Sequence, residues 1–95
     1  MLPVLIDNFY NDALRLIADA QQTLEQGKRA DLRRAAHTLK SNSATFGAMA
    51  LAALARDLED RARDGVLDGA SGVLAQIANA YEKAKAALEV QRKEL

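Results

Sequence analysis

The chain has 95 residues, and its 13 basic residues balance its 13 acidic ones, while cysteine is absent. This length supports one domain with a single core, but not a core that also encloses a large cofactor cavity. The balanced charge argues against recruitment of nucleic acid or an anionic membrane, and the lack of cysteine excludes disulfides and thiolate metal sites.

The first predicted element is a long amphipathic helix. Apolar residues recur at steps of three and four from Pro3 to Leu24, which indicates about six helical turns. Proline is tolerated in a first turn, and we allow for a short extra helical turn at the N-terminal residues. Gly27 offers a C-terminal stop.

A second helix is expected from about Lys28 or Ala30 to Thr45. At 100° per residue, one stripe of this helix collects the residues that we expect to face the core: Leu32, Ala35, Ala36, Leu39, Ser43 and Phe46. Gly47 separates this helix from a third, which Asp64 and Gly65 end.

The region from Asp68 to Gly72 is a weak start for a fourth helix, which continues to Leu88 and leaves a polar tail from Gln91 to Leu95 that we expect to fray. Strand signals are essentially absent. Four amphipathic helices with short connections predict an all-α protein, an antiparallel up-down four-helix bundle that forms one domain over residues 1–95.

The only histidine, His37, lies about 140° from Leu32 on the helical wheel and therefore points away from the core. Imidazole is a good nucleophile near neutral pH because a substantial fraction is uncharged. A lone histidine on a helix is often only a surface residue. Its phase and its neighbours favour a surface phosphoryl acceptor instead.

Four neighbours share this outward face of the second helix: Arg33, Lys40, Ser41 and Ala44. The small Ser41 and Ala44 leave an opening where another protein can approach the ring. Lys40 can pair with an anionic group on the imidazole, and Arg33 extends the positive potential, although its charge alone favours a solubilising role over a partner contact. Phosphoryl transfer needs such a protruding acceptor with cations beside it.

Other kinds of site have little support. One histidine without cysteine gives no convincing metal site, and no glycine-rich loop has the spacing that cradles the phosphates of ATP. We therefore expect no cofactor in this chain and no reaction with ATP alone. The mixed charges from Arg56 to Asp64 are interpreted as a solvated face without chemistry.

The segment from Ala36 to Ala48, followed by Leu51, Leu54 and Leu58-Glu59, closely resembles the histidine-containing phosphotransfer (HPt) domains of bacterial two-component phosphorelays. The resemblance implies that His37 is phosphorylated, through Nε2, and that Lys40 stabilises the phosphoryl group. Ser41 stands where the family most often has glycine. Lys28 replaces a common aspartate, so a helix cap worth about 1 kcal/mol is missing.

The same resemblance implies receiver domains as partners, with any Mg²⁺ held by the receiver. It also implies a cytoplasmic monomer without direct membrane contact. Because such domains often close a longer kinase polypeptide, the resemblance favours a module of a hybrid sensor histidine kinase, through which the domain can be tethered to the inner membrane. A non-catalytic interaction module that docks or sequesters a regulatory partner remains the alternative. Transfer of a phosphoryl group to His37 separates the two hypotheses.

Overall fold

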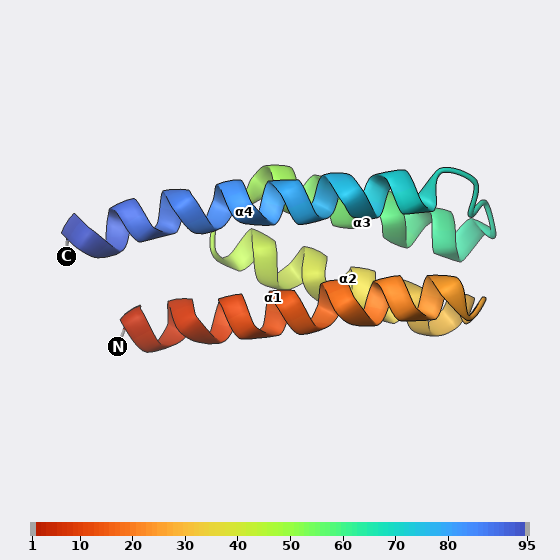
Figure 1. The fold of residues 1–95 in the computed structure, drawn as a ribbon, viewed down its shortest axis with the longest axis horizontal. Coiled ribbons are helices and arrows are strands. Elements are labelled where there is room, and N and C mark those ends of the chain that lie inside the picture. Colours follow the sequence, from red (N-terminus) through yellow and green to blue (C-terminus); the bar gives the residue numbers. More distant parts are fainter. Residues whose placement is uncertain (1, 95) are drawn as a thin grey trace.

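The computed structural model describes residues 2–94, and four helices in chain order make up the fold: α1 (Leu2–Glu25), α2 (Arg29–Thr45), α3 (Met49–Asp64) and α4 (Ala70–Glu94). Successive helices run antiparallel, and the described residues contain no strand (Figure 1). The predicted all-α, up-down four-helix bundle is confirmed. The N-terminal residues from Leu2 onward belong to α1 itself and form no separate turn.

The helices differ in length, so the two ends of the bundle differ in the helices that reach them. At 1.5 Å per residue, α1 and α4 are each about 36 Å long, whereas α2 and α3 are about 25 Å long. The N-terminal part of α1 and the C-terminal part of α4 therefore extend side by side beyond the turn between α2 and α3 (Figure 1). Both termini lie at this two-helix end.

The core forms where the apolar stripes of the four helices meet. On α2 the fully or almost fully buried residues are Leu32, Ala35, Ala36, Leu39 and Ser43, as the helical wheel predicted. Phe46 is half-buried and stacks on Phe9 of α1, with 4.8 Å between the ring centroids. Because the stripe faces inward, the opposite side of α2 is left to solvent.

The helix ends follow the glycine pattern of the sequence. Gly65 ends α3 with φ 76°, a left-handed conformation that costs an L-residue with a side chain more than it costs glycine. At the start of α2, Lys28 occupies the capping position without a side-chain hydrogen bond, which confirms the predicted loss of a cap. The bundle thus relies on packing more than on capping to hold α2 in place.

The prediction of a frayed tail is wrong for the described part of it. Helix α4 continues to Glu94, and Arg92 forms ion pairs with Asp7 of α1 at 2.7 Å and with Glu89 at 3.0 Å. The pair with Asp7 joins residues 85 positions apart in the sequence. Contact with the N-terminal part of α1 therefore orders the tail. The residues of the tail by themselves do not indicate this contact. Leu95 lies outside the described residues.

Candidate functional site

His37 lies on the solvent side of α2, where the helical wheel placed it, with 58% of its side chain exposed. The preceding residue, Ala36, is fully buried in the core. Because successive residues of a helix point to different sides, the ring of His37 is directed away from the core. The ring does not point freely into solvent, however. Its Nδ1 lies 2.8 Å from Oε2 of Glu59 on α3.

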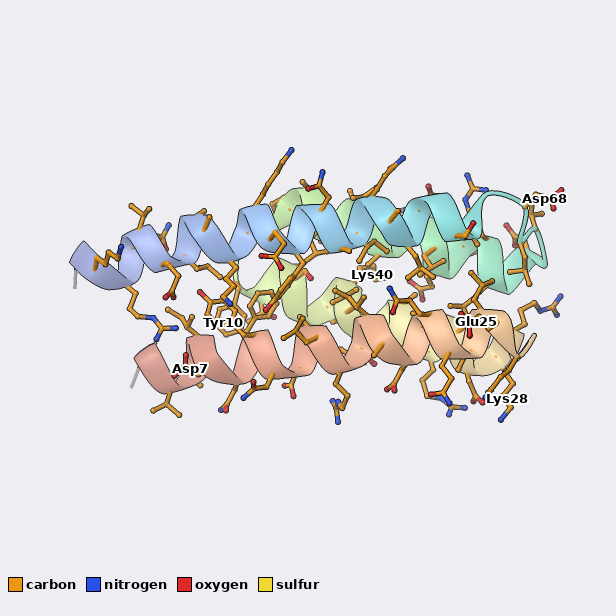
Figure 2. The ribbon with its side chains drawn as sticks, in the orientation of Figure 1. Asp7, Tyr10, Glu25, Lys28, Lys40 and Asp68 are labelled. Atoms are coloured by element: carbon orange, nitrogen blue, oxygen red, sulfur yellow. The ribbon has the colours of Figure 1, made fainter. Side chains whose placement is uncertain are left out.

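Glu59 is the centre of the site and is only 12% exposed. Its second oxygen, Oε1, lies 2.7 Å from Nζ of Lys40 in an ion pair. One carboxylate of α3 therefore holds two side chains of α2. Figure 2 shows Lys40 about midway along the molecule, between its two ends.

The charge state of Glu59 follows from these contacts. Burial raises the pKa of this carboxyl, but Lys40 and His37 outweigh burial, so the pKa lies below its usual value. An ionised carboxylate only accepts hydrogen bonds, so Nδ1 of His37 must donate its hydrogen to Glu59. In the neutral imidazole this leaves Nε2 unprotonated, with its lone pair free.

Two hollows flank the site, one on each side of Glu59 and Arg63, which line both. The first, of about 510 Å³, adjoins His37 toward the N-terminal end of α2 and is rich in arginine: Arg29, Arg33, Arg34 and Arg63. The second, of about 640 Å³, lies toward the C-terminal end of α2 and contains Lys40, Ser41 and Ala44 together with small, apolar and charged residues of α3, among them Arg56 and Asp60. The surface around His37 is therefore dominated by arginine on one side, whereas small residues are mixed with charges of both signs on the other.

The predicted site residues are thus divided between these features. His37 and Lys40 meet at one carboxylate, Arg33 lines the basic hollow, and the exposed Ser41 and Ala44 line the other. Instead of standing free to meet an anion on the ring, Lys40 is paired with Glu59 and is 32% exposed. The described residues include no group of three or more His, Cys, Asp or Glu side chains that could hold a metal ion.

The interpretation of Arg56 to Asp64 as a solvated face without chemistry is wrong at Glu59. A signal for this residue was present in the sequence. Glu59 follows the buried Leu58 and stands four residues after Ala55 and three before Ala62, which are also buried, so it flanks the core stripe of α3. A carboxylate at such a boundary is partly withdrawn from water and needs a partner.

Comparisons with known proteins identify the family and the fold of the chain. The sequence matches the Hpt domain family over residues 4–87. The fold is similar to the crystal structure of histidine-containing phosphotransfer protein B (HptB) from Pseudomonas aeruginosa PAO1, with a TM-score of 0.92 and 29% sequence identity over 98% of this chain and 81% of that one. No curated protein sequence matches the chain. With the family matched over most of its length, and its one histidine presented on the second helix of the bundle, the chain belongs to the Hpt domain family.

Proposed function

We propose that His37 accepts a phosphoryl group from the aspartyl phosphate of one receiver domain and passes it to the aspartate of another. The chain belongs to a family that carries phosphoryl groups on histidine in phosphorelays and interacts with receiver domains. His37 is the only histidine in the sequence. The observation that carries the proposal is its exposed ring, with Nδ1 held by Glu59 at 2.8 Å.

The contact with Glu59 supports a specific course for the transfer. The lone pair of Nε2 attacks phosphorus, the bond between phosphorus and the aspartate oxygen breaks, and the receiver keeps the released carboxylate. The phosphorylated ring retains its proton on Nδ1 and becomes positively charged. The carboxylate of Glu59 offsets that charge and keeps the ring in the orientation that exposes Nε2.

The neighbours of His37 have supporting roles in this proposal. Lys40, which its ion pair with Glu59 holds close to the ring, supplies a positive charge that helps to stabilise the phosphoryl group. Ser41 and Ala44 leave room for the receiver because they are small and exposed. Arg33 contacts the partner. The receiver supplies the Mg²⁺ that its own aspartate chemistry requires.

We further propose that the domain works as a cytoplasmic monomer, either free or as a module of a hybrid sensor histidine kinase. The described residues contain no helix that is long and apolar enough to cross a membrane. The exposed ring leaves the transfer face open to successive partners without a second copy of the chain.

The test is transfer from a purified receiver domain that has been phosphorylated on its aspartate with acetyl phosphate in the presence of Mg²⁺. The wild-type chain should acquire a label that is labile in acid and stable in base, as expected for phosphohistidine, and ATP alone should give none. The His37→Gln variant should acquire no label. It should also remain folded, because changing this exposed side chain should alter the free energy of unfolding by at most about 1 kcal/mol.

The matched control is Thr38→Ala, which changes the next residue of α2 and should leave transfer intact. Label that persists in His37→Gln would overturn the assignment of the acceptor. A wild-type chain that binds phosphorylated receivers without ever becoming labelled would favour the non-catalytic interaction module. Circular dichroism of each variant shows whether a loss of label reflects loss of fold.

A further inference from the structure

The basic hollow beside His37 contains more positive charge than its own carboxylates neutralise. Arg34 is paired with Asp31 at 3.3 Å, and Arg63 is paired with Asp60 at 3.2 Å and with Asp64 at 3.0 Å. Two arginines that line the same hollow, Arg29 and Arg33, form no ion pair among the described residues.

These two arginines stand in line with the phosphoryl acceptor. Arg29, Arg33 and His37 are spaced four residues apart on α2, so they occupy successive turns of one helix face. At 1.5 Å per residue, Arg33 lies about 6 Å and Arg29 about 12 Å from His37 along the helix axis. Both are exposed. The guanidinium of Arg29 is placed against Gly65 at the end of α3, a position that suits contact with the protein that delivers the phosphoryl group.

The position of Arg29 also depends on the adjoining end of α3. A Cβ atom built on Gly65 would lie 2.5 Å from Nη1 of Arg29, so the guanidinium rests directly against this glycine. Arg33 remains close enough to Asp64 to contribute, after Arg63, to the lowered pKa of that carboxyl, yet it forms no ion pair with it. Both guanidinium groups therefore remain available to an external anion.

The other side of His37 offers a different chemistry. The second hollow is lined by small residues such as Ser41 and Ala44 and by the strongly exposed Met49, but also by charges of both signs, including Arg56 and Asp60. The site is thus asymmetric along α2: arginine dominates it toward the start of the helix, whereas small residues are mixed with charges of both signs toward its end. A partner that carries carboxylates beside its phosphoryl donor would favour one orientation, because the first hollow presents two arginines without an ion pair, whereas the second presents one, Arg56, among the described residues.

We infer that Arg29 and Arg33 form a docking site for an acidic surface of the phosphorylated receiver, separate from the phosphoryl chemistry at His37. This inference rests on the proposed function, since the partner is the receiver that delivers the phosphoryl group. The pair raises the rate of productive encounter and sets the orientation of the partner on α2. It leaves the reactivity of the imidazole unchanged.

The test compares two reagents that reach His37 in different ways. The first is a receiver domain phosphorylated with acetyl phosphate and Mg²⁺, used at several concentrations and ionic strengths to obtain a second-order rate constant. The second is diethyl pyrocarbonate at pH 8, a small uncharged reagent whose product with imidazole absorbs at 240 nm. Because the chain has one histidine, that absorbance reports His37 alone.

The variant Arg29→Glu/Arg33→Glu should lower the second-order rate constant with the receiver at least about 10-fold at low salt and should flatten its dependence on ionic strength. Its reaction with diethyl pyrocarbonate should stay within about twofold of wild type, since an uncharged reagent experiences no steering. The matched control is Arg15→Glu on α1, an exposed position on the helix diagonally opposite α3. It reverses the same kind of charge and should change the receiver rate by less than about twofold.

A rate constant in Arg29→Glu/Arg33→Glu equal to that of Arg15→Glu would overturn the docking site. A parallel loss of reaction with diethyl pyrocarbonate would also overturn it, because the arginines would then act on the ring itself. The neutral variant Arg29→Gln/Arg33→Gln repeats the comparison with less disturbance of the contact at Gly65. If no receiver labels the wild-type chain, the proposed function fails. If the wild-type chain and the arginine variants are labelled at the same rate, the docking site alone is refuted.

Discussion

Two carboxylates of this protein sit in similar networks at different places in the bundle, and their comparison separates a functional site from a structural one. Glu59 on α3 accepts a hydrogen bond from the His37 ring at 2.8 Å and pairs with Lys40 at 2.7 Å. Glu89 on α4 accepts a hydrogen bond from the Tyr10 hydroxyl at 2.8 Å and pairs with Arg92 at 3.0 Å.

The two networks differ in which member is exposed. At Glu59 the carboxylate is buried and the ring is exposed, so the far nitrogen of the ring can meet a partner. At Glu89 the ring of Tyr10 is buried, its hydroxyl is satisfied, and the side chains of Lys85 and Arg92 lie over its face. Figure 2 shows Tyr10 between α1 and α4, at the end of the molecule where those helices extend beyond α2 and α3. The same set of groups therefore presents a nucleophile in one place and fastens two helices in the other.

The largest effect that would test this contrast is on phosphoryl transfer after removal of each carboxylate. Glu59→Ala should lower the rate of transfer from a phosphorylated receiver about 10- to 100-fold, because Nδ1 loses its acceptor and the phosphorylated ring loses its counter-charge. Glu89→Ala should leave transfer within about twofold of wild type. Glu59→Gln should recover part of the rate, since an amide oxygen still accepts from Nδ1. Equal transfer in the two alanine variants would remove the functional distinction.

A smaller effect is expected on stability when the buried tyrosine hydroxyls are deleted. Tyr10→Phe should lower the free energy of unfolding by about 1–2 kcal/mol, because its hydroxyl donates to a charged acceptor. The hydroxyl of Tyr81 is buried without a hydrogen-bond partner among the described residues, so Tyr81→Phe should cost little or even stabilise the fold. Urea unfolding of both variants measures the difference, and phosphoryl transfer should stay normal in each. A cost for Tyr81→Phe as large as for Tyr10→Phe would contradict this assignment.

The loss of stability at alkaline pH should report the buried tyrosine of the α1–α4 network. Burial, followed by the hydrogen bond and charge of Glu89, raises the pKa of Tyr10 to about 12, and burial also raises the pKa of Tyr81. The folded state thus keeps protons that the unfolded chain releases near pH 10. The tyrosine contribution is fully present below pH 10 and is lost as pH rises toward 12. Absorbance at 295 nm should show no tyrosine titrating near pH 10 in the folded protein, and Tyr10→Phe should reduce the alkaline loss of stability.

The smallest expected effect is on the loss of stability at acid pH, which should report the protonation of Glu59. Its pKa is lowered in the folded protein, so the unfolded state binds the proton more readily and stability falls as the solution is acidified. The contribution is present above pH about 4.5 and is lost as pH drops through the folded value. Urea unfolding between pH 3 and pH 6 should show a shallower decline in Glu59→Gln than in wild type. An unchanged slope would mean that other carboxylates account for the acid limb.

Much of the fold and part of the site were predictable because they depend on local periodicity. The buried stripe on α2 placed Leu32, Leu39 and Ser43 in the core, and the same phase placed His37 outside. The glycines marked the ends of the helices to within a few residues. Each of these features depends on residues within one or two helical turns of one another.

Glu59 was missed because its role depends on a contact between residues 22 positions apart, which helical phase alone does not report. The order of the C-terminal tail was missed for the same reason, since Asp7 and Arg92 meet only after α1 and α4 pack together.

Sequence by itself therefore determined the helices, the face that each one buries and the outward direction of His37, because periodicity and composition act within a helix. Tertiary structure alone decided which carboxylate holds the ring, which arginines remain unpaired beside it and which nitrogen is free to react. Those outcomes depend on how α2 packs against α3. The free energy of that packing comes from the burial of apolar surface, which does not depend on the charges at the edge of the interface.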